Sequence, residues 1–191
     1  MEKLAKEKEV VGIYISGHPL DDYKFEMKYF CNAKLESLKN LEQHLGKNLS
    51  FGGIVTNVQH RTAKNGKGWA TFVLEGYDES YEFRIFDEEY LKYRHFLLQN
   101  QFVYFKINVK EGWVNRETGK KSDPRIQFLD AKMLADVLPT FAKKLFIHLD
   151  IKDLHSNFVA ELNELFAANA GDNSVTFEVM ELEKIKTTAA D

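Results

Sequence analysis

Lysine and arginine side chains gather in a short glycine-bearing segment near residue 65. The basic and histidine residues of this segment are His60, Arg61, Lys64 and Lys67. No acidic residue lies between residues 60 and 74, and Gly66 and Gly68 let the backbone adapt to a phosphate chain. Trp69 comes next, and a tryptophan ring can stack on a nucleobase with a gain of about 1–3 kcal/mol. These residue types predict a single-strand nucleic-acid contact that tolerates any base sequence.

A second basic segment, EGWVNRETGKKSDPR, covers residues 111–125. Its aromatic and basic residues are Trp113, Arg116, Lys120, Lys121 and Arg125. Three acidic residues, Glu111, Glu117 and Asp123, dilute its charge. Loops are often charged simply because they are solvated, so either segment alone is weak evidence for binding. The two segments become informative only if the fold places them together.

The composition limits the classes of protein to which this chain can be assigned. The formal net charge of the 191 residues is −3, so a nucleic-acid partner would have to meet local basic patches. The single cysteine, Cys31, excludes an internal disulfide and indicates a reducing compartment. Neither a signal-peptide core nor an apolar run of about 18 residues is present. We expect a soluble, cytoplasmic, monomeric protein with no membrane partner.

Residues 1–48 have the pattern of a helical lead-in without a core of its own. Gly17-His18-Pro19 interrupts this pattern, because Pro19 disfavours the helical conformation at His18. Two short helices are then predicted, over residues 23–30 with Asp21 or Asp22 as the cap, and over residues 35–46.

Residues 49–138 contain five predicted strands and one helix. Period-two alternation predicts strands over 51–61, 68–76, 80–86, 101–110 and 125–134, with a helix over 87–100 that Asp87 caps. The order β-β-β-α-β-β is that of the OB-fold, a five-stranded Greek-key barrel. Glycines at 52 and 53 fit a first strand that bends around a barrel corner.

Residues 139–191 have the pattern of a small β-α-β unit. Strands are predicted over 143–150 and 173–182, with a helix over 151–171 between them. Leucine and phenylalanine at helical spacing form the stripe that should be buried, namely Leu154, Phe158, Leu162 and Leu165. The predicted fold class is therefore α+β: a helical lead-in, an OB barrel that binds nucleic acid, and a β-α-β module for protein interaction.

The OB-fold assigns a place to both basic segments. Ligands of this fold lie on strands two and three, flanked by the loop between strands one and two and the loop between strands four and five. Alternation on the third strand puts Arg84 on the outer face, away from Tyr81, Phe83 and Ile85. The predicted nucleic-acid-binding residues are Arg61, Lys64, Lys67, Trp69, Arg84, Trp113, Arg116, Lys120, Lys121 and Arg125.

The acidic and histidine residues do not form a catalytic pattern. Asp21-Asp22 and Asp87-Glu88-Glu89 stand where a helix begins, which the helix dipole favours. Two-metal phosphoryl transfer requires carboxylates that converge on a pair of ions, and no spacing here predicts such convergence. His18 has no partner at ligand spacing and fits a rigid turn. We predict no catalytic residue, no metal ligand and no cofactor in this segment.

Two stretches carry a family resemblance. The stretch EKEVVGIYISGHPLDDY at 7–23 resembles the segment that precedes the OB domain in the alpha subunit of bacterial DNA polymerase III, and its matching residues are Gly12, Ser16, Gly17, His18, Pro19 and Leu20. Residues 52–93 are similar to the OB sequence of that family at Thr62, Lys64, Gly66, Lys67, Phe72, Leu74, Glu75 and Phe86. Ala63 stands where a lysine is usual, Gly76 where an aspartate is usual, and Ile13 where an aromatic residue is usual.

The resemblance implies a non-catalytic segment of a replicative DNA-directed DNA polymerase, a nucleotidyltransferase. Its polymerase carboxylates and their Mg²⁺ would lie upstream of residue 1. The OB domain would contact single-stranded template DNA. The β-α-β unit would belong to the C-terminal domain that engages the clamp-loader tau subunit and other replisome subunits.

Two alternatives remain beside this interpretation. The barrel could be a protein-interaction scaffold with little DNA affinity, or an OB module of the kind that binds tRNA anticodons. The tRNA alternative leaves Ser-Gly-His-Pro-Leu and the β-α-β unit unexplained.

Overall fold

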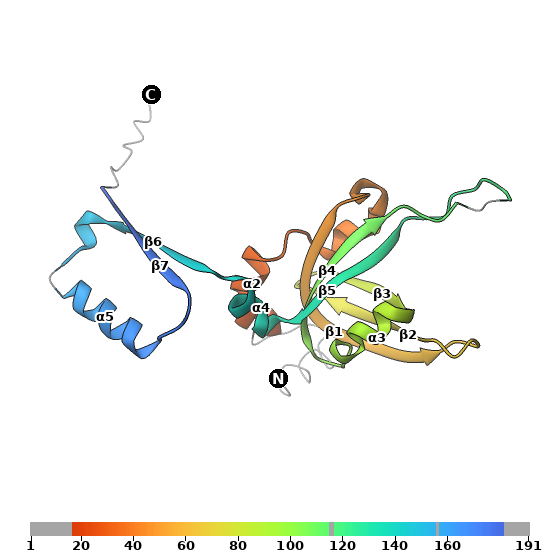
Figure 1. Ribbon diagram of the computed structural model, residues 1–191, viewed down its shortest axis with the longest axis horizontal. Coiled ribbons are helices and arrows are strands. Elements are labelled where there is room, and N and C mark those ends of the chain that lie inside the picture. Colours follow the sequence, from red (N-terminus) through yellow and green to blue (C-terminus); the bar gives the residue numbers. More distant parts are fainter. Residues whose placement is uncertain (1–16, 115–116, 156, 182–191) are drawn as a thin grey trace, which may run out of the picture. The chain divides into compact units, whose positions relative to one another are not determined.

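The computed structural model describes residues 17–114, 117–155 and 157–181 (Figure 1). The chain divides into two compact units, Met1–Pro139 and Thr140–Asp191. Within the described residues, no helix is long and apolar enough to cross a membrane.

The lead-in packs on the sheet through short helical turns. They are η1 (Pro19–Tyr23), α2 (Lys24–Tyr29) and η2 (Leu35–His44). The helix predicted over 35–46 is instead a 3₁₀ segment, because the backbone at Asn40 leaves the helical region. The predicted aspartate cap is also wrong, since His18 is the N-cap and Tyr23 precedes α2 without a side-chain cap. Leu20, Leu35 and Leu38 are buried, so the lead-in closes one side of the core.

Five antiparallel strands form the first unit. They are β1 (Asn48–Thr62), β2 (Gly68–Glu75), β3 (Ser80–Phe86), β4 (Phe102–Lys110) and β5 (Arg125–Met133), in the spatial order β3-β2-β1-β4-β5. Between β3 and β4 lie α3 (Asp87–Tyr93) and η3 (Arg94–Phe96), a shorter helix than predicted, with Phe86 rather than Asp87 as its N-cap. Phe51, Phe72, Phe83 and Phe105 fill the centre of the sheet's concave face.

β1 serves two partners in succession, as the predicted bend requires. Its first half pairs with β4 and its second half with β2, and a bulge interrupts the β2 pairing near Asn57. A Cβ on Gly53 would stand 2.6 Å from the carbonyl oxygen of Glu75 and 2.8 Å from Cγ of Leu74. A side chain at position 53 would therefore clash with β2, which accounts for glycine there.

The predicted α+β class is confirmed, but the predicted closed barrel is not. Among the described residues no strand pairing joins β3 to β5, and the curled sheet meets itself only through side chains such as Phe83 and Phe128, with ring centroids 5.7 Å apart. Side chains of α3 occupy the β5 edge instead. The N–H of Phe128 donates to Oε2 of Glu89 at 3.4 Å, and the hydroxyl of Tyr93 donates to the carbonyl of Leu129 at 2.6 Å. The helix thus satisfies edge groups that a paired strand would otherwise bind.

A short helix, α4 (Leu134–Phe141), follows β5. The second unit then contains β6 (Lys144–Asp150), η4 (Ile151–Asp153), α5 (Phe158–Ala168) and β7 (Ser174–Met180), with β6 parallel to β7 as the β-α-β pattern predicts. The prediction that Leu154, Phe158, Leu162 and Leu165 form a buried stripe is wrong, because no residue of α5 is buried. Leu154 precedes the helix, Leu165 is exposed, and Phe158 and Leu162 are half-buried, while Phe166 of the helix contacts Phe177 of β7.

Candidate nucleic-acid interface

The outer face of β1, β2 and β3 presents one continuous set of side chains. Ala70, Phe72 and Leu74 of β2 are buried, so the alternating positions of that strand, Trp69 among them, lie on the outer face. The strand register places Arg61 of β1 and Phe86 of β3 on either side of Trp69. Arg84 is exposed two residues before Phe86, as alternation predicts.

Arg61, Trp69 and Phe86 form a continuous row, which we call the aromatic row. The Arg61 guanidinium lies 5.4 Å from the centroid of the Trp69 ring. The Trp69 and Phe86 rings are stacked, with centroids 5.7 Å apart and planes inclined by 19°. Phe86 is 51% exposed, so its ring is open to solvent on this face. Two flat rings and a cation therefore lie side by side across three strands, and these are side chains on which a nucleobase can stack.

Phe86 is the site residue that the sequence prediction missed. Its signal was present, because the same alternation that puts Arg84 outside puts Phe86 outside as well. The sequence analysis used Phe86 only as a position of family resemblance.

A groove of about 910 Å³ adjoins the aromatic row. It is lined by residues of both predicted loops and of β3, including Lys67, Glu82, Arg84, Phe86, Asp87, Trp113 and Arg125. The β1–β2 loop and the β4–β5 hairpin project from the same end of the sheet in Figure 1. Of the two basic segments, Lys67, Trp113 and Arg125 therefore line one groove, whereas Arg61, Lys64, Trp69, Lys120 and Lys121 do not line it.

The β1–β2 loop is a tight turn closed by backbone hydrogen bonds. The N–H of Gly66 donates to the carbonyl of Ala63, and the N–H of Ala63 donates to the carbonyl of Lys67, both at 2.9 Å. Gly66 adopts a positive φ of 80°, a conformation that favours glycine. Lys64 is exposed at the tip of this turn.

The β4–β5 hairpin presents a second arginine and tryptophan pair. The Arg125 guanidinium lies 4.5 Å from the centroid of the Trp113 ring, and Trp113 is 71% exposed. The N–H of Trp113 donates to Oγ of Ser122 at 2.8 Å, which fixes the backbone beneath the ring. Lys120 is exposed beside this pair, whereas Arg116 lies outside the described residues.

Three of the predicted cations form ion pairs with carboxylates. Lys67 pairs with Asp87 at 3.2 Å, Arg84 with Glu82 at 3.6 Å and Lys121 with Glu111 at 3.1 Å. Glu89 lines the same groove, and burial raises the pKa of its carboxyl, while the N–H of Phe128 and the charges of Arg125 and Lys92 oppose this rise. The groove is therefore a mixed surface of cations, carboxylates and exposed rings.

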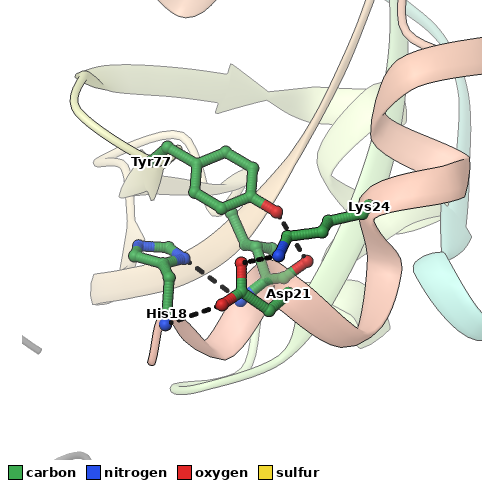
Figure 2. Close-up of polar contacts among 5 residues, drawn as sticks. His18, Asp21, Lys24 and Tyr77 are labelled. Atoms are coloured by element: carbon green, nitrogen blue, oxygen red, sulfur yellow. Dashed lines mark hydrogen bonds and ion pairs between the residues drawn. The ribbon is translucent and has the colours of Figure 1, made fainter. Parts of the chain in front are cut away.

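The Gly-His-Pro-Leu turn lies at the other end of β2 and β3 and is structural (Figure 2). His18 Nδ1 accepts from the N–H of Leu20, and the N–H of His18 donates to Oδ2 of Asp21, both at 3.1 Å, which forms a capping box. The Tyr77 hydroxyl donates to the carbonyl of Leu20 at 2.9 Å. These bonds use His18 to build the turn, in agreement with the role predicted for it.

Other chemically active groups lie away from the groove. Burial raises the pKa of the Cys31 thiol to about 12, so at neutral pH this thiol is protonated and unreactive. Within the described ranges, no group of three or more His, Cys, Asp or Glu side chains is placed to hold a metal ion.

A curved antiparallel sheet with basic hairpin loops and exposed rings defines the first unit, and the whole chain is similar to segments of much longer proteins. The chain is 30% identical to the DNA polymerase III subunit alpha of Saccharopolyspora erythraea over 117 residues, which is 60% of this chain and 10% of that protein. It is 30% identical to the Campylobacter jejuni subunit over 86% of this chain and 14% of that protein. With the Mycobacterium tuberculosis subunit it shares 24% identity over 99% of this chain and 15% of that protein.

The resemblance that Gly-His-Pro-Leu and the second strand predicted is confirmed, and the chain is similar to a segment of DNA polymerase III alpha subunits over nearly its whole length. It spans only 10–15% of the length of these relatives. No protein-family model matches the chain. A crystal structure of a candidate nucleic-acid-binding lipoprotein from Klebsiella pneumoniae covers 58% of this chain and 85% of that protein, but its 11% identity and TM-score of 0.34 carry no argument.

Proposed function

We propose that the first unit binds single-stranded DNA in a sequence-tolerant manner, as a non-catalytic segment of a DNA polymerase III alpha subunit. The observation that carries this proposal is the stack of Trp69 and Phe86 beside Arg61. Exposed rings provide a face on which any base can stack, and the cations of the two hairpins follow the phosphates. The similarity to alpha subunits makes DNA the expected nucleic acid.

Replacement of Phe86 tests the stacking platform directly. Fluorescence anisotropy of labelled oligo-dT should show that Phe86→Ala weakens binding by on the order of tenfold, because stacking is worth about 1–3 kcal/mol per base. Phe25→Ala is the matched control, since Phe25 is a phenylalanine of α2 with 52% exposure that does not line the groove. Equal affinities for the two variants would reject the aromatic row as the binding surface.

A salt titration tests the phosphate contacts. Binding by the whole 191-residue chain should weaken steeply with salt, and Lys64→Ala/Lys67→Ala should make the slope of log K against log salt shallower by at least about 0.7, the share of one full phosphate contact. An affinity that changes neither with salt concentration nor with these substitutions would reject the proposal. Tighter binding of tRNA than of oligo-dT would favour the anticodon-type alternative.

We further propose that the second unit contacts another protein, with the clamp-loader tau subunit as the expected partner. The supporting observation is that β6 and β7 expose large apolar side chains, Phe146 by 53% and Val179 by 51%. Apolar surface of this kind is typical of an interaction site. Purified tau subunit should retain the chain in a pull-down, and Phe146→Ser should reduce the retained fraction where Lys144→Ser does not. Failure of the unmodified chain to bind tau would reject this partner.

A further inference from the structure

Two cations of the groove already have anionic partners. Lys67 Nζ lies 3.2 Å from Oδ2 of Asp87, and a guanidinium nitrogen of Arg84 lies 3.6 Å from Oε1 of Glu82. All four side chains line the groove and are half or more exposed, at 59% and 50% for the first pair and 67% and 57% for the second. The carboxylates therefore stand beside the cations that DNA phosphates would neutralise.

Stability does not account for these two pairs. Exposed ion pairs contribute only about 0.2–1 kcal/mol each, because both charges are well solvated in the absence of the partner. These pairs matter more for the binding of a polyanion than for stability. A phosphate that reaches Lys67 must displace Asp87 or share the cation with it. The released carboxylate then attracts a salt cation, which cancels part of the counterion release that drives DNA binding.

We propose that Asp87 and Glu82 are built-in competitors of DNA phosphates that lower the affinity of the groove and its salt dependence. The inference rests on the proposed single-stranded DNA function and deepens it. The arginines that lie over tryptophan rings, Arg61 and Arg125, then act mainly through stacking, which salt screens less. The resulting surface holds a strand weakly and lets it move, while the rings keep contact.

The test neutralises both carboxylates without changing their shape. In Asp87→Asn/Glu82→Gln, oligo-dT binding should become roughly tenfold tighter at low salt. The slope of log K against log salt should also steepen by about 1.4, because two contacts now release their full share of about 0.7 counterions each. The control is Asp22→Asn/Asp78→Asn, which makes the same charge change on exposed residues of η1 and of the β2–β3 hairpin. A slope and affinity equal to those of the control would overturn the inference.

The outcomes separate this inference from the proposed function. If neither the original chain nor the double variant binds oligo-dT at any salt concentration, the DNA function itself fails. If the original chain binds and depends on Phe86 and the lysines, but neutralisation changes nothing, only the competitor role fails. Asp87 begins α3 at a positive φ of 49°, which asparagine tolerates well. Should the double variant nevertheless unfold, Glu82→Gln alone must steepen the slope by about 0.7.

Discussion

The two ends of β2 and β3 differ in how their polar groups are used. At one end, which we call the closed end, residues 17–24 cover the β2–β3 hairpin, and His18, Asp21 and Tyr77 bind groups of the same chain. At the other, the open end, the β1–β2 loop and the β4–β5 hairpin project with exposed cations and rings. The same strands are thus fixed at one end and presented at the other, so removal of the polar groups at the closed end should affect stability, and removal of the exposed cations and rings at the open end should affect binding.

Among these predictions, the largest change in stability is expected from a substitution at Gly53, which lies beside the closed end of β2. Gly53→Ala places a Cβ 2.6 Å from the Glu75 carbonyl oxygen and should lower the free energy of unfolding by about 3 kcal/mol. Gly66→Ala at the open end meets nothing within 4 Å and should cost only about 1 kcal/mol, the cost of its positive φ. Urea denaturation followed by tryptophan fluorescence measures both, since Trp69 and Trp113 both lie in the first unit. Equal losses of unfolding free energy in Gly53→Ala and Gly66→Ala would contradict the proposed difference between the closed and open ends.

Removal of the Tyr77 hydroxyl should have an intermediate effect. Tyr77→Phe leaves the carbonyl of the buried Leu20 without this donor, so we expect a loss of about 0.5–1.5 kcal/mol with no change in oligo-dT affinity. Tyr29→Phe is the control, because Tyr29 is 60% exposed. A change in DNA affinity without a change in stability would contradict the assignment of Tyr77 to the closed end.

The smallest effect should come from Asp21, and it should depend on pH. The hydrogen bond from Lys24 and the N–H of His18 lower the pKa of the Asp21 carboxyl, although desolvation opposes them. A lowered pKa in the folded state stabilises the fold above the ordinary aspartate pKa, and this stabilisation is lost as the pH falls through the lowered value. Asp21→Asn should therefore melt below the original chain at pH 7, and the difference should close as the pH falls through the lowered pKa of Asp21. A difference that grows on acidification would contradict this sign.

Much of the fold followed from local pattern, and the exceptions have tertiary causes. Alternation found five strands in order and the outward position of Arg84, because each depends on a strand's own residues. The open seam between β3 and β5 was not predictable, because it depends on Glu89 and Tyr93 of α3 reaching the β5 edge. The backbone at Asn40 also leaves the helical region, although the composition of residues 35–46 favours a continuous helix.

The sequence predicted which cations line the candidate site better than it predicted the carboxylates that pair with them. Nine of its ten predicted residues fall within the described ranges, and Lys67, Arg84, Trp113 and Arg125 line one groove. The Arg84–Glu82 pair could have been foreseen, since residues two apart on a strand share a face. The Lys67–Asp87 pair could not, because it joins residues twenty positions apart through the β2–β3 register.

The divided pairing of β1 has a consequence for how the chain folds. β2 follows β1 directly and can form a hairpin with it at once, whereas β4 pairs with β1 across a sequence separation of 48 positions, from Ile54 to Phe102. Pairing across such a sequence distance is slow, because loop closure must precede the contacts that reward it. During synthesis the edge of residues 49–55 that pairs with β4 therefore stays unpaired until β4 has been made. This segment is where a nascent chain would aggregate or require a chaperone.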